Sequence, residues 1–161
     1  MRVILLISTI LLFSCKQSTP VTDNSSSTTQ EIIPVKESIF LTMERTPCFG
    51  KCPNYKITIF NTGNVVYEGF SFTEKEGKHT KKLSQKQLSE IESQIEVINL
   101  FELKDKYDSK MTDIPSVYLY IVYKGNKKKI LDRDGGPSEL KRFEKLIDFL
   151  VIDDNLKKVT E

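Results

Sequence analysis

Two cysteines four residues apart, Cys48 and Cys52, constrain the fold of this chain more than any other feature of its sequence. Gly50 lies between them, and a proline flanks the pair on each side. Residues 38–44 and 55–60 largely alternate apolar and polar side chains, which predicts a β-strand with one buried face on each side of the pair. We therefore expect a rigid corner that joins two strands of one sheet.

The cysteine pair is expected to form a structural disulfide. Three intervening residues, one of them glycine, let two Cβ atoms approach to bonding distance, and thiols outside the cytoplasm tend to be oxidised. A reactive thiol pair is the first alternative, although the spacing differs from the Cys-x-x-Cys motif of redox proteins. Metal ligation is the second, but zinc would need further ligands and the chain has one histidine, His79.

The N-terminus resembles the signal of a bacterial lipoprotein. Residues 3–13 are almost entirely apolar, a run that is too short to span a bilayer and typical of a signal peptide. This run leads into Leu12-Phe13-Ser14-Cys15, which resembles a lipobox. The resemblance implies a signal peptide at residues 1–14 and acylation of Cys15. The protein would then be anchored to a membrane of the cell envelope, with its domain outside the cytoplasm. A plain secretory signal with an incidental cysteine is the alternative.

Residues 15–37 are rich in serine and threonine and contain almost nothing that could pack in a core. Such a composition cannot offset the entropy cost of ordering, so it predicts a flexible tether between the lipid and the folded part. We expect a single domain at residues 38–152, followed by a loose C-terminal tail at residues 153–161.

Two segments of the expected domain have the apolar spacing of amphipathic helices. The first should begin after Ser84, which matches a capping box with Gln87, and end near Asn99. The second should have Pro137 as its first residue and Leu150 near its end. Further strands are expected at residues 65–70, 79–82, 116–124 and 127–132. This order predicts an α+β fold, an antiparallel sheet of about five strands with both helices packed on one face.

Residues 116–124 are apolar on both sides, which predicts a central strand that is covered on both faces or nearly so. The tyrosines of this strand leave a second possibility open. The sheet face away from the helices would then present an aromatic surface to a partner.

The cysteine corner also carries a family resemblance. Arg45-x-x-Cys48-Phe49-Gly50-x-Cys52-Pro53-x-Tyr55, together with Gly69, Tyr107 and Thr112-Asp113-x-Pro115, resembles an uncharacterised family, domain of unknown function 6438, of bacterial envelope lipoproteins. The resemblance covers about residues 38–150. It implies the localisation and the extent of the domain, and it implies no activity.

Four residues of these motifs are candidates for binding a ligand or for holding a loop in place: Arg45, Tyr55, Tyr107 and Asp113. Arg45 comes at the end of an apolar strand, and we expect it to pair with Asp113 and so to pin the long connection of residues 100–115 onto the corner. A small anion-binding site at Arg45 is the alternative.

The composition argues against several classes of function. The chain has 24 basic and 22 acidic residues, whereas nucleic-acid binding needs a concentrated basic face, so the lysine runs at 81–82 and 127–129 are interpreted as solvated. His79 is likewise interpreted as solvated, and no Gly-x-Ser-x-Gly elbow is present, which argues against a hydrolase.

Two groups of aspartates could form a calcium site or an acid–base pair: Asp105, Asp108 and Asp113 in one loop, and Asp132 with Asp134. Neither group has the spacing of an EF-hand loop, and aspartates favour turns and caps, so we expect no metal or other cofactor there. The sequence therefore favours a non-enzymatic, lipid-anchored module that binds an envelope protein or a small ligand. A thiol-active envelope protein that uses Cys48 and Cys52, for redox chemistry or metal binding, is the alternative.

Overall fold

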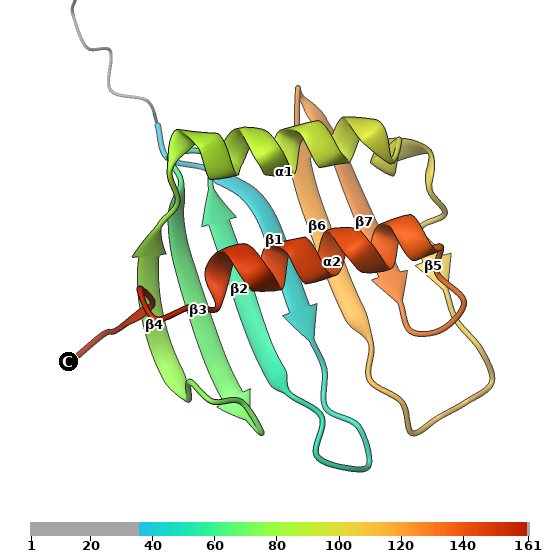
Figure 1. The fold of residues 1–161 in the computed structure, drawn as a ribbon. Helices are drawn as coiled ribbons and strands as arrows, with labels where there is room; N and C mark the ends of the chain where they lie inside the picture. Colours follow the sequence, from blue (N-terminus) through green and yellow to red (C-terminus); the bar gives the residue numbers. More distant parts are fainter. Residues whose placement is uncertain (1–35, 161) are drawn as a thin grey trace, which may run out of the picture. The chain divides into compact units, whose positions relative to one another are not determined.

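The computed structural model describes residues 36–160 (Figure 1). The signal peptide, Cys15 and all but the last two residues of the expected tether lie outside the described residues. The elements of the described part, in chain order, are β1 (Ile39–Arg45), β2 (Asn54–Phe60), β3 (Asn64–Ser71), β4 (Gly77–Lys82), α1 (Gln85–Val97), the 3-10 turn η1 (Leu100–Glu102), β5 (Lys106–Tyr107), β6 (Val117–Tyr123), β7 (Asn126–Asp132), α2 (Ser138–Val151) and β8 (Lys157–Lys158).

The strands form one sheet of eight strands in the order β5-β7-β6-β1-β2-β3-β4-β8. All neighbours are antiparallel except β5 and β7, which are parallel, so the sheet is mixed. The expected α+β class is confirmed, but the expectation of an antiparallel sheet with about five strands is wrong. The two outermost strands, β5 and β8, have two residues each, and such short strands leave no alternating pattern in a sequence.

Both helices lie on the same face of this sheet (Figure 1). The capping box at α1 is confirmed: Gln87 N donates to Ser84 Oγ over 3.3 Å, and Ser84 N donates to Gln87 Oε1 over 2.9 Å. Pro137 is the N-cap of α2 rather than its first residue. The buried stripes of the two helices and the inward side chains of the central strands form the core, which includes Leu41, Met43, Ile57, Ile59, Ile91, Ile95, Ile121, Leu140 and Ile147.

The central strand β6 is covered on one face only. Val117, Leu119 and Ile121 are buried toward the helices, whereas Tyr118, which alternates with them, is 47% exposed. The expectation of a strand covered on both faces or nearly so is therefore wrong. In the described residues no helix covers the other face, since α1 and α2 lie on the same side.

The segment after α2 packs against the sheet instead of forming a loose tail. Leu156 is buried, and β8 pairs with β4 through His79 and Lys158. Lys81, which we expected to be solvated, has a side chain that is only 5% exposed, and its Nζ donates to Leu150 O over 2.7 Å. The Leu150 carbonyl at the end of α2 thus gains a charged donor from Lys81 of β4. His79 is also buried, and its ring meets the Tyr67 ring in an edge-type arrangement.

Candidate functional site

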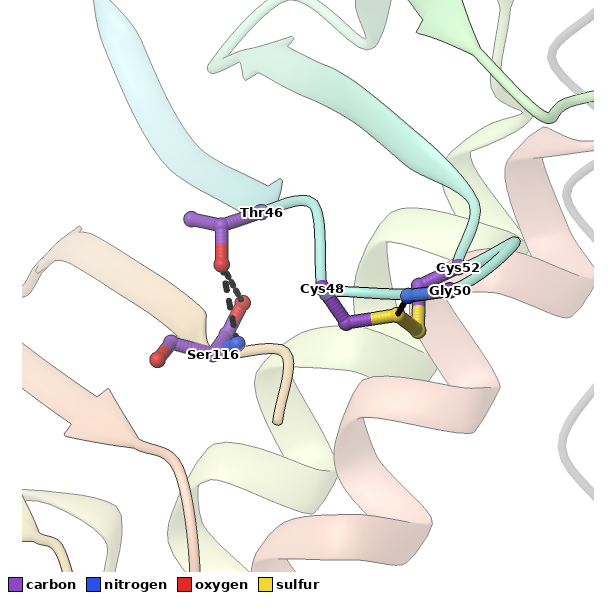
Figure 2. The surroundings of a disulfide bond; sticks show 5 residues. All are labelled: Thr46, Cys48, Gly50, Cys52 and Ser116. Atoms are coloured by element: carbon purple, nitrogen blue, oxygen red, sulfur yellow. Dashed lines mark hydrogen bonds between the residues drawn. A yellow bond between two sulfur atoms is a disulfide. The ribbon is translucent and has the colours of Figure 1, made fainter. Parts of the chain in front are cut away.

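The cysteine corner connects β1 to β2, and Cys48 Sγ and Cys52 Sγ are at disulfide distance (Figure 2). Gly50 N donates to Cys48 Sγ over 3.2 Å, so the turn folds back on its own sulfur. Phe49, at the tip of the corner, is 92% exposed. The corner therefore projects from the sheet as a closed loop with an apolar tip.

Backbone hydrogen bonds hold the corner to the start of β6. Ser116 N donates to Thr46 Oγ1 over 2.9 Å (Figure 2), and Thr46 N donates to Ser116 O over the same distance. Phe49 N also approaches Asp113 O at 3.5 Å. The long connection thus contacts the corner, but not through the expected ion pair, because the Asp113 side chain is exposed and Arg45 pairs with acidic residues of α2 instead.

Arg45, Tyr55 and Asp148 form a hydrogen-bonded group that we call the Arg45 cluster. Arg45 Nη2 lies 2.7 Å from Asp148 Oδ2, Arg45 Nε donates to Tyr55 OH over 2.8 Å, and Tyr55 OH donates to Asp148 Oδ1 over 2.6 Å. The strand register explains the arrangement, since Arg45 on β1 and Tyr55 on β2 are direct cross-strand partners. Both side chains therefore reach the same turn of α2.

Burial and charge fix the protonation states of the Arg45 cluster. Burial is the largest single effect and lowers the pKa of the Arg45 guanidinium, but Asp148, Tyr55 and Glu144 together outweigh it and raise that pKa. Burial, followed by the negative charge of Asp148, raises the pKa of Tyr55 well above its ordinary value. Tyr55 therefore stays a phenol and acts as a hydrogen-bond donor, which makes it unsuited to act as a base near neutral pH.

A cavity of about 660 Å³ opens beside this cluster, between α2, the cysteine corner and the β3–β4 turn. Arg45 and Asp148 have side chains that are 22% and 25% exposed, so a bound molecule could reach both charges. Most of the remaining wall is apolar or uncharged, and it is formed by Cys52, Pro53, Phe72, Thr73, Pro115, Ser116, Val117 and Ile152, with Glu74 and Lys145 as further charged residues. The lining carries two positive and two negative side chains, which favours a ligand without a large net charge.

A second group of charges lies fully buried next to the cluster, where Asp132 of β7 and Glu144 of α2 form what we call the buried acid pair. Lys141 Nζ lies 2.7 Å from Asp132 Oδ2, and Arg45 Nη1 lies 3.6 Å from Glu144 Oε2. Neither contact has hydrogen-bond geometry, and both Asp132 oxygens and Glu144 Oε1 lack a hydrogen-bond partner within the described part of the chain. Such orphaned carboxylate oxygens are unusual in folded proteins.

Glu144 should carry a proton at neutral pH. Burial, reinforced by the negative charge of Asp132, raises the pKa of Glu144 to about 8 even though Arg45 and Lys141 act in the opposite direction. Gly136 closes the other side of the pair, because a Cβ at that position would lie 2.5 Å from both Asp132 oxygens. Any other residue at position 136 would therefore force the Asp132 carboxylate or the backbone to shift.

The sequence contained a signal for this pair that our turn-and-cap interpretation of Asp132 missed. Asp132 follows Ile130 at the two-residue spacing of the inward face of β7. Glu144 lies four residues after Leu140 and three before Ile147, within the apolar stripe of α2. Charged residues at core positions of both elements should have predicted a buried contact between them.

The other candidate residues lie away from the cavity lining. Tyr107 OH accepts a hydrogen bond from Lys104 N over 3.0 Å, and Tyr107 O accepts one from Arg133 N, so this residue fastens β5 to β7. Asp105 and Asp108 pair with Lys128 and Arg133. Between residues 36 and 160 no group of three metal-ligating side chains comes together. Of the four predicted site residues, the cavity thus brings together Arg45 and Tyr55 but neither Tyr107 nor Asp113.

The chain belongs to the family described as Domain of unknown function (DUF6438), whose model matches residues 39–151. Comparison with curated proteins and with solved structures found no match. Neither α1 nor α2 has the length and the apolar run that crossing a membrane requires, and no other helix of the described residues does.

Proposed function

We propose that this member of the DUF6438 family is a non-enzymatic binding module of the bacterial cell envelope, anchored to a membrane through acylated Cys15. Its ligand site is the cavity beside the Arg45 cluster. The observation that carries this proposal is the composition of that cavity, an accessible Arg45–Asp148 pair at one side of a mostly apolar wall. Sites of this kind take a small molecule or a segment of a partner protein, with the polar pair setting its orientation.

The chemistry of the cavity supports binding rather than catalysis. Arg45 is neutralised by Asp148, and Tyr55 holds its proton. His79 is buried on β4 against Tyr67 and is absent from the lining, so the site contains no base with an ordinary pKa near neutrality.

The cavity and the start of β1 lie at opposite ends of the sheet. The described chain enters the sheet near Ile39, and β1 runs from there to the cysteine corner at the other end (Figure 1).

Acylation of Cys15 can be tested directly. A clickable fatty-acid analogue fed to cells that produce the full chain should label the wild type and not the Cys15→Ala variant, because acylation requires the thiol. Detection in the gel, with total protein quantified by antibody, corrects for different expression. Label retained on the variant would show that the anchor lies elsewhere or does not exist.

The cavity can be tested with a photo-crosslinking amino acid placed at Phe72, which lines it. Irradiation of intact cells should give a discrete adduct from this position, because a ligand in the cavity would lie within reach of the probe. The matched control is Val97, which is 67% exposed at the end of α1. Equal adducts from both positions, or none from Phe72, would contradict a ligand site in the cavity.

One observation favours the thiol-active alternative. Gly50 N donates to Cys48 Sγ, so a Cys48 thiolate would already have a hydrogen-bond donor, and Cys52 lines the cavity and would face bound molecules. A substrate thiolate would attack one sulfur, form a mixed disulfide and release the other sulfur as a thiolate. A second substrate thiolate would then attack the substrate sulfur of this mixed disulfide, form the substrate disulfide and release the protein sulfur as a thiolate, so the protein is left as the dithiol.

Thiol chemistry separates the two functions. If the disulfide is structural, the native protein should show no thiol that reacts with maleimide until it is unfolded or strongly reduced. After reduction the fold should persist with a loss of about 2 kcal/mol, the size expected for so small a loop. Rapid alkylation of Cys48 after mild reduction, together with a reduction potential above that of inert disulfides, would instead favour the thiol-active protein.

A further inference from the structure

The sheet face opposite to the helices carries rows of charged, hydroxyl and aromatic side chains that do not line the cavity. Cross-strand pairing places partners on one face of a sheet. One such row runs across β6, β1, β2, β3 and β4 and consists of Tyr118, Glu44, Lys56, Glu68 and Lys78. The next row runs from β7 to β4 and consists of Lys129, Tyr120, Thr42, Thr58, Val66 and Thr80. Both helices lie on the other side (Figure 1).

The positive charge of this face is concentrated at one edge. In the first row Glu44 and Glu68 lie opposite Lys56 and Lys78, and these charges offset one another. Lys127 and Lys129 of β7, by contrast, have Val122 and Tyr120 as cross-strand partners, and neither lysine forms an ion pair within residues 36–160. At β6 and β7 this face therefore combines aromatic rings with ammonium groups that form no ion pair in the described part of the chain.

The geometry of these two strands suits a polymer whose rings can stack on aromatic side chains and carry negative charges. A depression of about 510 Å³ is lined by the two tyrosines, by four lysines and by two acidic residues, so its charged lining has a net positive charge: Tyr118, Tyr120, Lys56, Lys127, Lys128, Lys129, Glu44 and Asp105. Lys129 Nζ lies 5.9 Å from the centre of the Tyr120 ring, so charge and ring are presented together. Tyr118 and Tyr120 are two positions apart on one strand, which spaces their rings by roughly 7 Å.

We propose that this face, which we call the tyrosine–lysine face (Tyr118, Tyr120, Lys127 and Lys129), binds an acidic polysaccharide. Sugar rings would stack on the two tyrosines while carboxylate groups pair with the two lysines. The same observations disfavour a nucleic-acid duplex, because its phosphates, about one per 1.7 Å of helix axis, would also meet Glu44 and Glu68 in the adjoining row. This site is separate from the cavity of the proposed function, whose lining shares none of its residues.

The test uses the full chain purified in detergent micelles and immobilised polygalacturonate, at low ionic strength, with dextran as the uncharged control. Wild-type protein should bind polygalacturonate and not dextran. The double variant Lys127→Ala/Lys129→Ala should bind about tenfold more weakly, since each exposed ion pair contributes modestly. Tyr118→Ala, which keeps every charge, should also weaken binding several-fold because a stacking surface is lost.

The charge-matched control is Lys86→Ala/Lys110→Ala, which removes two exposed lysines elsewhere on the domain. It should change the affinity less than twofold. An equal loss in this control would show that only net charge matters and would overturn the site. Stronger binding to single-stranded DNA than to polygalacturonate would overturn the ligand class. Absence of binding to polygalacturonate would show that Lys127 and Lys129 only protect the sheet edge from pairing with other chains.

Discussion

Replacing Arg45 with methionine should lower the free energy of unfolding by roughly 3 kcal/mol, because removal of one partner from a largely buried charged group leaves the others uncompensated. Asp148 would lose two hydrogen bonds from the guanidinium, and Tyr55 OH would lose the one that it accepts from Arg45 Nε. Methionine keeps much of the apolar volume, so the expected loss comes from charge and hydrogen bonding. Urea unfolding at pH 7, followed by circular dichroism, measures it.

The control for this substitution is Arg142→Met. Arg142 also lies beside an acidic residue, but its side chain is 67% exposed and its pair with Glu139 is formed within one helix. Such a pair contributes about 0.5 kcal/mol or less. If both variants unfold at the same urea concentration, the Arg45 cluster contributes no more than a surface ion pair, and the cavity lacks the fixed polar pair on which the proposed function depends.

Arg45 connects the cavity to the buried acid pair. Its guanidinium contacts Asp148, which lines the cavity, and approaches Glu144, which lies behind it. With Glu144 protonated, Arg45 is balanced by Asp148 and Lys141 by Asp132, so the buried region is close to neutral. A net charge in this region would appear only when Glu144 ionises. A ligand that changes the contacts of Arg45 should therefore also change the proton affinity of Glu144.

The local parts of this structure could be predicted from the sequence, and the contacts between distant elements could not. Ser84 and Gln87 act within one helical turn, and Ile57 and Ile59 alternate within one strand, so short patterns contain the necessary information. Arg45 and Asp148 are 103 residues apart, and their contact depends on how α2 docks across β1 and β2. No local sequence pattern predicts how α2 packs on these strands. For this reason the prediction that Arg45 pairs with Asp113 was wrong.

The distinction between local patterns and contacts of distant elements also explains which of the candidate residues share one site. The motif residues Arg45, Cys52 and Tyr55 are close in sequence, and they are also together at the cavity. Tyr107 and Asp113 belong to a connection whose course depends on the two-residue pairing of β5 with β7, and that pairing was not predictable. Motif membership alone therefore did not identify the residues that share one site.

Raising the pH should weaken the fold through Glu144. Its folded-state pKa of about 8 lies above the ordinary value of 4.5, so between these values the folded state holds a proton that the unfolded state has released. The free energy of unfolding should then fall as the pH rises from 5 to 8 and change little through this residue above that range. The loss should be at least about 1.4 kcal/mol, the equivalent of one pKa unit.

The Glu144→Gln variant should lose this dependence, because an amide does not titrate and can donate a hydrogen bond to Asp132. At pH 8 it should be more stable than the wild type, an unusual result for a substitution at a buried position. Urea unfolding at pH 5, 6, 7 and 8 gives the slope for both proteins, and the difference between the slopes removes the titration of all other groups. Glu139→Gln, at an exposed position of the same helix, should keep the wild-type slope. If Glu144→Gln keeps it as well, Glu144 is ionised in the folded protein, and its charge must be balanced by Arg45 and Lys141.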